Sequence, residues 1–488
     1  MDIMTIITLA IYMIAMLAIG YWSYRKTSTL SDYMLAGRDL GPAVTALSAG
    51  ASDMSSWMVM ALPGAFYISG LSEIWLPIGL SLGAYINYFV VAPRLRIYSE
   101  YADNSITVPD YLENRFEDTT RVLRLVSGVF IVIFFAIYSA SGMVAGGKMF
   151  ESAFGAGYHT GIFITLGVIV FYTLFGGFLA VSTTDFVQGV IMFIALVLVP
   201  IVAFTDIGGD FSVVSELNAI DPTMFNLFTG ETVLGIIGLL AWGLGYFGQP
   251  HIIVRFMAIR SHKELKVARR VNIIWMVVGL IGASAVGLIG AAYFANHGGP
   301  LEDEETVLIE FANVLFHPII TGFVLAAILA AIMSTVASQL LVTSSALTED
   351  FYRAFFRKGA SDKELVFIGR MSVLIVGVVA AIIAFNPESN ILDIVSNAWA
   401  GFGATFGAVI LVSLHWKQMT RAGAIAGVVV GGLTVIIWIS TGLSEWLYEL
   451  VPGFLLSLAA LYIVSKRTKQ PSDKTRKIFT DMEQDLKG

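Results

Sequence analysis

The residues best able to do chemistry lie inside an apolar stretch near the start of the chain. Between Ala46 and Trp57 stand one aspartate, Asp53, and four serines that include Ser55 and Ser56, with no basic residue among them. A helix broken at such a stretch frees backbone carbonyls, which can face a cation, and N–H groups, which can face a carboxylate. The stretch therefore predicts a site for a small cation, a carboxylate-bearing solute, or both. A kinked helix whose hydroxyls bond to their own backbone is the simpler alternative.

A second candidate site lies between Ala241 and Pro250, where three glycines and a proline weaken a helix. Trp242 and Tyr246 are four residues apart, so they would share one face of that helix. The string at 243–248 also matches the GxGxxG pattern of dinucleotide-binding turns. We reject that interpretation because no strand precedes the string and a proline follows it where a helix should open. A flexible glycine-rich packing face remains the alternative.

A third candidate is a row of hydroxyl side chains in a later apolar run. Ser334, Thr335 and Ser338 follow Ala331 within a few residues. Their hydroxyls could face a neighbouring helix. Serine and threonine also join transmembrane helices through ordinary hydrogen bonds, so this row alone decides nothing.

The composition places these candidates in a membrane. Of the 488 residues, 57% are hydrophobic and only 13% are charged, against about 25% charged in soluble domains. The absence of cysteine excludes disulfides and thiolate chemistry, and the six histidines show no metal-ligand spacing. No catalytic triad or carboxylate pair stands out either. We therefore predict an all-α polytopic membrane protein that is not an enzyme.

Apolar runs of roughly 20 residues, the length that spans a bilayer, recur about thirteen times. With the N-terminus outside, all of the 29 lysines and arginines except Lys148 fall on the cytoplasmic side or in the cytoplasmic end of a span. The C-terminus is then cytoplasmic, and its basic tail is expected to be solvated. The protein is expected in the cell membrane as a multi-pass protein.

The broken segments repeat at corresponding places in the chain. The broken second span begins one block of five spans and the broken seventh span begins another, and an odd number of spans gives the two blocks opposite orientation. This pattern predicts a 5+5 inverted repeat. The expected parts are a first helix and loop (1–38), a first repeat (39–206), an external loop (207–232), a second repeat (233–415), two further helices (416–465) and a cytoplasmic tail (466–488).

At these residues the chain resembles the sodium/solute symporter family, and within it the members that carry L-proline. The resemblance covers essentially the whole length. It is strongest at five stretches, namely 32–38, 45–57, 176–189, 242–257 and 330–335. It implies the leucine-transporter fold and Na⁺-coupled import of L-proline by alternating access.

The resemblance also implies roles for individual residues. A sodium site would use backbone oxygens of Ala51, Met54 and Ala331 with the hydroxyls of Ser334 and Thr335. The substrate pocket would be formed by Asp53, Ser55, Ser56, Trp57, Tyr138, Trp242, Tyr246 and Pro250, and the cytoplasmic ion path by Arg38 and Asp185. Some members bind a second sodium, but Ala337 replaces a hydroxyl of that second site here, which favours a single sodium ion.

Three alternatives remain open at this stage. The solute could be a sugar, sialic acid, pantothenate or another amino acid. The chain could be a sensor or a membrane-bound enzyme, although no signalling domain is present. Protons could replace sodium, with Asp53 and Asp185 as carriers, although a cage of neutral oxygens argues against this. We expect the lipid bilayer, Na⁺ and the solute as partners, with no nucleic acid and no obligatory protein partner.

Overall fold

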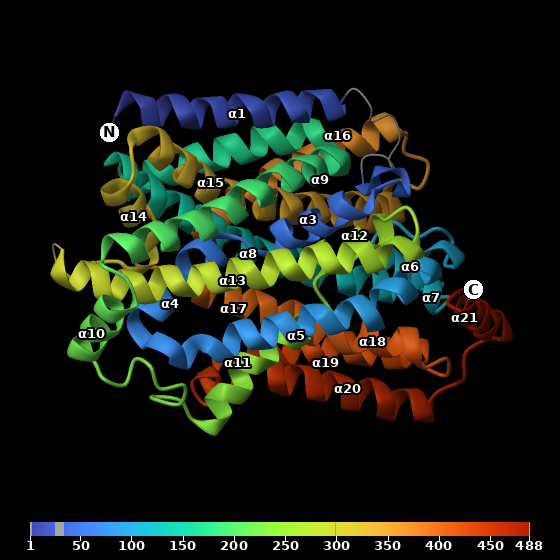
Figure 1. Ribbon diagram of the computed structural model, residues 1–488. Helices are drawn as coiled ribbons and strands as arrows, with labels where there is room; N and C mark the ends of the chain where they lie inside the picture. The colour runs from blue at the N-terminus through green and yellow to red at the C-terminus, as the bar shows by residue number, and fades with distance from the viewer. Residues whose placement is uncertain (1, 25–33, 298, 488) are drawn as a thin grey trace.

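The computed structural model describes residues 2–24, 34–297 and 299–487, which fold into one elongated bundle of helices (Figure 1). Within those ranges the β-structure amounts to a single bridge between Leu40 and Ile259. The α-helices are α1 (Ile3–Tyr24), α3 (Pro42–Asp53), α4 (Leu62–Ser69), α5 (Trp75–Val90), α6 (Ala92–Tyr101), α7 (Val108–Arg115), α8 (Val122–Phe154), α9 (Tyr158–Asp206), α10 (Asp210–Ile220), α11 (Val233–Gly245), α12 (Pro250–Ala258), α13 (Leu265–Asn296), α14 (Val307–Leu315), α15 (Pro318–Ser345), α16 (Asp362–Ile383), α17 (Ile391–Phe402), α18 (Ala408–His415), α19 (Arg421–Ser440), α20 (Leu450–Arg467) and α21 (Asp473–Asp485). Shorter 3₁₀ or π turns are η1 (Ala36–Arg38), η2 (Trp57–Ala61), η3 (Gly70–Ile74), η4 (His262–Glu264), η5 (Glu304–Thr306), η6 (Ala346–Phe356), η7 (Gly403–Gly407) and η8 (Leu443–Glu445).

Eleven helices in the described ranges are long and apolar enough to span a membrane. One of them, Trp57–Val90, contains a turn that separates α4 from α5, and a shorter apolar arm covers Tyr158–Leu174. Treating these arms separately accommodates the roughly thirteen spans predicted from sequence. The all-helical, multi-pass architecture is confirmed, and the total of thirteen stays a prediction.

Two glycines make the turns that separate these arms. Gly70, with φ of 66°, lies against Met224, and a Cβ there would overlap the Met224 carbonyl. Gly177, with φ of 59° and ψ of −169°, divides α9 into two arms. Other residues reach such angles only at a steric cost, so glycine is required where the chain reverses inside an apolar environment.

The outer surface of the bundle is apolar. On α1, Ile14 is 65% exposed, and on α16, Ile375 is 60% exposed. Exposure of this kind is stable only where lipid replaces water, since hydrocarbon against water costs roughly 25 cal/mol per Å². The buried interior, by contrast, holds most of the polar residues that the sequence marks as functional.

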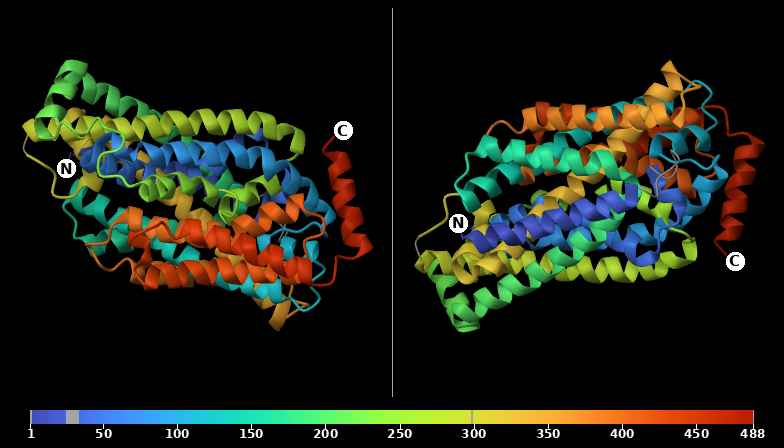
Figure 2. Two further views of the ribbon diagram at one scale, coloured as in Figure 1. Left: turned by 90° about the horizontal axis from the view of Figure 1, so that it is seen from below. Right: turned by 90° about the horizontal axis from the view of Figure 1, so that it is seen from above.

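The basic side chains of the tail from Lys466 onward are exposed, and one apolar face of the tail also docks onto the bundle. Helix α21 lies across one end of the bundle (Figure 2) and buries Phe479 and Met482. The Phe479 ring lies 6.3 Å from that of Tyr98, and the Arg115 guanidinium lies over the Phe479 ring at 5.5 Å. An amphipathic pattern explains the docking, because the tail carries apolar residues on one face of a helix.

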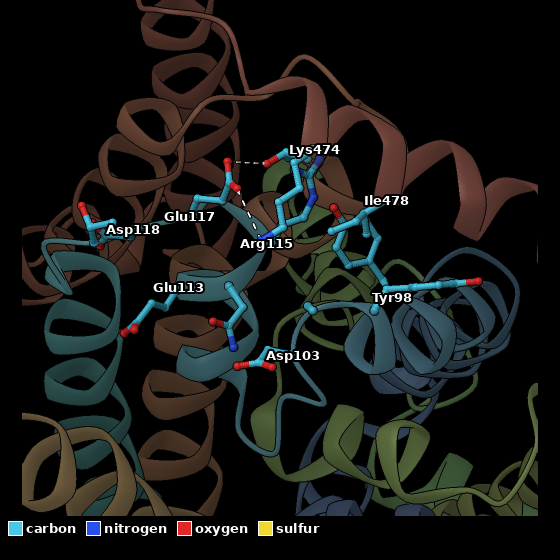
Figure 3. Close-up of a pocket in the computed structure, with 13 residues that line it drawn as sticks. Tyr98, Asp103, Glu113, Arg115, Glu117, Asp118, Lys474 and Ile478 are labelled. Carbon is cyan, nitrogen blue, oxygen red and sulfur yellow. Dashed lines mark hydrogen bonds and ion pairs between the residues drawn. The ribbon is translucent and has the colours of Figure 1, made fainter. Parts of the chain in front are cut away.

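A cavity of about 510 Å³ lies beside this docked helix (Figure 3). Its walls come from α6, α7, α21 and the loop after α7, with Glu117 facing Lys474 across it at 3.9 Å. None of the residues that line it belongs to α3, α11, α12 or α15. The cavity is therefore separate from the broken helices that the sequence marks as functional.

Those broken helices pack together inside the bundle. Helix α3 ends at Asp53 and the chain resumes helical structure at Ser56, while α11 ends at Gly245 and α12 begins only at Pro250. Helix α3 contacts α12, α15, α9 and α13. The two predicted breaks are thus confirmed, and α3 lies among the helices that carry the other candidate residues.

Candidate functional site

The break after α3 has a definite local cause. Met54 leaves the helical region at φ −76° and ψ 79°, and the Ser55 N–H turns back to donate to the Asp53 carbonyl at 2.9 Å. The Trp57 indole N–H donates to that same carbonyl at 2.9 Å, and the Trp57 backbone N–H donates to Ser55 Oγ at 3.3 Å. Short polar side chains that compete for backbone groups hold the chain open here. The carbonyls of the last turn of α3 are consequently left without helical partners.

One of these carbonyls is the centre of an oxygen cluster. The Ser334 hydroxyl donates to Ala51 O at 2.7 Å, and the Thr335 hydroxyl donates to the same atom at 3.3 Å. Ser334 Oγ also lies 3.2 Å from Ala331 O. All four residues are at most 1% exposed. Four of the five predicted sodium ligands are therefore brought together by α3 and α15.

The fifth predicted ligand, Met54, is buried at the break, and its N–H donates to Gly50 O at 2.8 Å. Within the described residues, no hydrogen bond joins Met54 to the other four predicted ligands. The cluster holds carbonyl and hydroxyl oxygens and no carboxylate. Such a donor set suits a hard monovalent cation, because neutral oxygens can replace its hydration shell.

An aromatic wall lies beside the break. The Trp242 ring is 6.5 Å from Trp57, 6.1 Å from Trp399 and 5.6 Å from Tyr448. Tyr246 packs edge-on against Trp399 at 5.1 Å and donates its hydroxyl to Asp53 Oδ2 at 2.5 Å. Tyr246, the residue after α11, therefore joins the predicted aromatic pair directly to the end of α3.

Trp399, on α17, belongs to this aromatic wall and is not revealed by the sequence. Its indole N–H donates to the Trp242 carbonyl at 2.8 Å, and its own carbonyl accepts from Gln249 at 3.1 Å. A Cβ at Gly245 would overlap the Trp399 ring, so this glycine permits the close approach of α11 and α17. The signal available in sequence, a tryptophan in an apolar run, is too common to single out.

Helices α8 and α12 contribute a further group of buried rings. Tyr138 and His251 meet edge to face at 5.9 Å, and Phe135 lies 5.4 Å from the same imidazole. Pro250 is the first residue of α12, as expected of a proline that follows a break. His251, directly after it, is fully buried and was not predicted. An intramembrane histidine beside a helix break was the signal that could have identified it.

Several buried polar atoms of the predicted substrate residues and of the neighbours of Pro250 have no hydrogen-bond partner in the described part of the chain. They are Asp53 Oδ1, Ser56 Oγ, the Tyr138 hydroxyl, Gln249 Oε1 and both imidazole nitrogens of His251. A buried polar group that makes no hydrogen bond costs roughly 1–3 kcal/mol. Such atoms are available to bond a polar ligand.

The two residues predicted on the ion path lie in different places. Asp185, in the second arm of α9, is fully buried; it accepts from Ser48 at 2.8 Å and pairs with Arg255 at 3.2 Å. Arg38 lies in η1 and donates to Met257 O at 2.7 Å and Ser105 O at 2.5 Å. No hydrogen bond or ion pair joins Asp185 to Arg38 in the described part of the chain. Asp185 is thus close to the site, and Arg38 closes the end of the bundle.

Arg38 stays charged despite its position. Burial, with the nearby Arg96, lowers the pKa of Arg38 to about 10. A guanidinium with that pKa is still protonated at neutral pH. Arg38 therefore holds η1, the end of α12 and the segment after α6 together with charge-assisted hydrogen bonds.

Comparisons with known proteins identify the family. Residues 33–431 match the model of the sodium:solute symporter family. The chain is 60% identical to the high-affinity proline transporter PutP of Bacillus subtilis (strain 168), over 96% of this chain and 98% of that protein. It is 57% identical to the osmoregulated proline transporter OpuE of the same organism over 100% and 99% of the two chains. It is 56% identical to a sodium/proline symporter of Staphylococcus aureus (strain NCTC 8325 / PS 47) over 96% and 93%.

Solved structures share the fold. A Na⁺-coupled sialic acid symporter in a substrate-bound, outward-open state superposes with a TM-score of 0.82 at 20% identity, covering 96% of this chain and 99% of that one. Mhp1, a nucleobase-cation-symport-1 family transporter, superposes with a TM-score of 0.57 at 13% identity, covering 92% and 98%. The architecture is therefore the leucine-transporter type with a 5+5 inverted repeat, as the paired breaks predict.

Proposed function

Because this chain belongs to the sodium:solute symporter family, we propose that it imports L-proline together with Na⁺ by alternating access. The observation that carries the proposal is the neutral oxygen cluster at Ala51, Ser334 and Thr335, close in the chain to Asp53, which accepts a hydrogen bond from Tyr246 of the aromatic wall. The names of relatives that are 56–60% identical over nearly the whole chain support proline as the solute. The alternative, another small solute carried by the same family, is an outcome of the test below.

The break after α3 supplies the ion site. When Na⁺ binds, the hydroxyls of Ser334 and Thr335 turn their lone pairs toward it, and the Ala51 carbonyl exchanges hydrogen bonds for the ion. Ala331 and Met54 complete the cage with their carbonyls. No group in this cage titrates near neutral pH, which argues for Na⁺ over a proton as the coupling ion.

The pocket offers three kinds of surface for three parts of proline. Trp242 and Tyr246 form a wall for the ring, whose three methylenes contribute roughly 2 kcal/mol on burial at about 0.8 kcal/mol each. Amides and hydroxyls at the break, Ser55 and Ser56 among them, suit the carboxylate. Asp53 has the sign that suits the secondary ammonium. Tyr138, Trp57 and Pro250 close the remaining sides.

Coupling follows from the shared break. Ala51 gives its carbonyl to the ion, and Asp53, two residues later, gives its side chain to the pocket. A cation that orders this turn also orders the groups that contact the solute. The conformational entropy lost in ordering the turn is then already spent when the second ligand binds, so Na⁺ and the solute each favour binding of the other. Direct contact between Na⁺ and proline is not required.

The orientation in the cell membrane is part of the proposal. With the N-terminus outside and the C-terminus cytoplasmic, Arg38 and α21 lie at the cytoplasmic end. The two repeats are assigned to 39–206 and 233–415, joined by an external segment at 207–232. The helices in 416–465 and the tail at 466–488 follow the second repeat. Positive charges on the cytoplasmic side support this assignment.

Uptake into proteoliposomes tests the function. Labelled L-proline should accumulate when an inward Na⁺ gradient is imposed, and an inside-negative potential should increase it by about 2.3 kcal/mol per 100 mV for each net charge moved. A panel of labelled amino acids, a sugar, sialic acid and pantothenate separates proline from the alternatives. Full uptake on a proton gradient at constant low Na⁺ would contradict the ion assignment.

A further inference from the structure

Helix α21 lies across the end of the bundle that is assigned to the cytoplasm, where it packs against α6 (Figure 2). Its hydrogen bonds to the bundle lie at its two ends. At the first end, Glu117 accepts from Ser472 at 2.5 Å and from Thr475 at 3.0 Å. At the other end, Asp485 accepts from the Tyr101 hydroxyl at 2.8 Å. The helix therefore links α6, which ends at Tyr101, to the segment that leads from α7 into α8.

An aromatic contact holds the middle of α21. Phe479 is 2% exposed, and its ring lies over the Arg115 guanidinium at 5.5 Å. The rings of Tyr98 and Phe116 lie over the same guanidinium at 5.0 and 4.9 Å. Arg115 Nε donates to the Ser413 carbonyl on α18 at 3.1 Å. Helix α21 thus completes an aromatic cage around a cation that belongs to α7 and is bonded to α18.

The aromatic cage leaves this guanidinium short of hydrogen bonds. Both terminal nitrogens of Arg115 are buried and have no hydrogen-bond partner in the described part of the chain. Burial of a charged group without hydrogen bonds is costly, and water would reach both nitrogens if α21 moved away. Undocking therefore exposes the Phe479 ring but hydrates Arg115. Because these two effects oppose each other, the docking of α21 is reversible.

Helix α6 connects the docked tail to the broken helices. Arg96 donates to the carbonyls of Ile259 at 2.5 Å and Arg260 at 3.1 Å, directly after the end of α12. Ser99 accepts from Arg38 at 3.0 Å, in the turn η1 that precedes α3. Helix α6 is therefore tied to the ends of both broken helices on the side of the bundle that α21 covers.

Alternating access requires that this end of the bundle opens. A path from the breaks to the cytoplasm separates the ends of α3 and α12 from the helices beside them, and α6 moves with these ends because it is bonded to them. Helix α21 is bonded to α6 and also to the segment after α7, and its Phe479 ring covers the cation that is bonded to α18. It must release one side before the end can open.

We propose that α21 is a reversible clamp. In its docked position it holds α6 against α7 and α18, and it thereby slows the opening of the binding site to the cytoplasm. This inference rests on the proposed alternating access and on the proposed orientation in the membrane. It gives the tail a role in the transport cycle, although no residue of the tail belongs to the ion cage or to the pocket.

The experiment measures opening with one introduced cysteine. The chain contains no cysteine of its own, so the rate of reaction with a charged maleimide reports a single position. Ile259→Cys places this probe directly after α12, where the native side chain is 0% exposed. In purified full-length protein that carries the probe, Phe479→Ala should raise the labelling rate about tenfold or more, because a large buried ring is lost from the docked contact. Tyr101→Phe, which deletes only the hydrogen bond to Asp485, should raise the rate about two- to tenfold.

Two controls separate release of the clamp from general loosening. Thr480→Ala is the matched variant on α21, because Thr480 is exposed and bonds only to its own helix at Arg476 O, 3.0 Å away. It should leave the labelling rate of the probe unchanged. Val307→Cys, on α14, is an equally buried probe at the opposite end of the bundle (Figure 1). Its labelling should not respond to Phe479→Ala, and equal acceleration at both probes would overturn the clamp.

Na⁺-driven uptake of proline by the same proteins separates the clamp from the proposed function. A wild type without such uptake would overturn the function itself. A wild type with Na⁺-driven uptake, together with an unchanged labelling rate in Phe479→Ala, would overturn the clamp alone. If Phe479→Ala is not recovered as folded protein, Tyr101→Phe decides, because its side chain is 41% exposed and tolerates the loss of one hydroxyl. Labelling of that variant at the rate of its parent would then overturn the clamp.

Discussion

Replacing Thr335 with valine tests the sodium cage with the least change of shape. Valine has the size of threonine and substitutes a methyl group for the hydroxyl that lies 3.3 Å from Ala51 O. That carbonyl keeps its shorter hydrogen bond, from Ser334 at 2.7 Å, so the fold of the ion-free protein should survive. The bound ion, however, loses one of its proposed oxygens.

The expected loss follows from the cost of one missing buried polar contact, roughly 1–3 kcal/mol. Since 1.4 kcal/mol is tenfold in a binding constant, the Na⁺ concentration for half-maximal binding should rise by about five- to 150-fold. Ser334→Ala should cost more than this, because Ser334 Oγ lies near two carbonyls, Ala51 O and Ala331 O.

The assay is ²²Na⁺ binding to purified protein, followed by uptake of proline as Na⁺ is varied. Thr343→Val is the matched control, because Thr343 is equally buried on α15 but bonds only to its own helix at Gln339 O, 2.7 Å away. Thr343→Val should leave the Na⁺ requirement unchanged. If Thr335→Val shows the same Na⁺ half-saturation as this control, Thr335 does not belong to the cage and the role of Ser334 is weakened with it.

Three further substitutions address the pocket. Trp242→Ala should weaken proline binding by about tenfold or more, the loss of roughly 2 kcal/mol of ring burial, while ²²Na⁺ binding is retained; unchanged proline affinity would remove this residue from the pocket. Tyr246→Phe deletes the hydroxyl that bonds Asp53 and should weaken proline binding by about five- to 150-fold; a Tyr246→Phe protein with wild-type affinity would show that Asp53 is held by other groups. Gly245→Ala places a methyl group against Trp399 and should lower both thermal stability and proline affinity by roughly 1–3 kcal/mol; an equally stable variant would mean that the contact between α11 and α17 is loose.

Local features of the sequence were sufficient to find the breaks. The polar run around Asp53 and the glycines before Pro250 each stand in an apolar span, where every polar group and every interruption of the helix carries a cost. Ser334 and Thr335 were identified for the same reason. The docking of the tail was not predicted, because the apolar face of α21 is visible only once its helix and its docking surface are both known.

Long-range packing placed the residues that the sequence did not reveal. In the sequence Trp399 looks like any residue of an apolar run. Its role becomes visible only in the fold, where α17 lies against α11 and the Trp399 indole N–H donates to the carbonyl of Trp242, 157 residues away in the chain. Arg255 was grouped with the basic residues of a cytoplasmic segment, since sequence gives its charge and not its partner. Its pairing with Asp185, 70 residues away, depends on how α9 and α12 pack.

The spacing of functional residues along α3 explains why one broken helix can serve two ligands. Ser48, Ala51 and Asp53 stand within six residues and face, in turn, the ion pair of Asp185 with Arg255, the oxygen cage and the pocket. Ala51 acts through its backbone carbonyl, so the affinity for the ion depends on the conformation of the break and not on the identity of the Ala51 side chain. Asp53 acts through its side chain, whose position depends on that same conformation. Linkage then requires that Na⁺ favours the solute by the same factor by which the solute favours Na⁺. A break that was rigid in the absence of ligand would bind each of them more tightly and couple them less, so the non-helical turn at Met54 is best understood as the element through which the ion gradient is converted into solute accumulation.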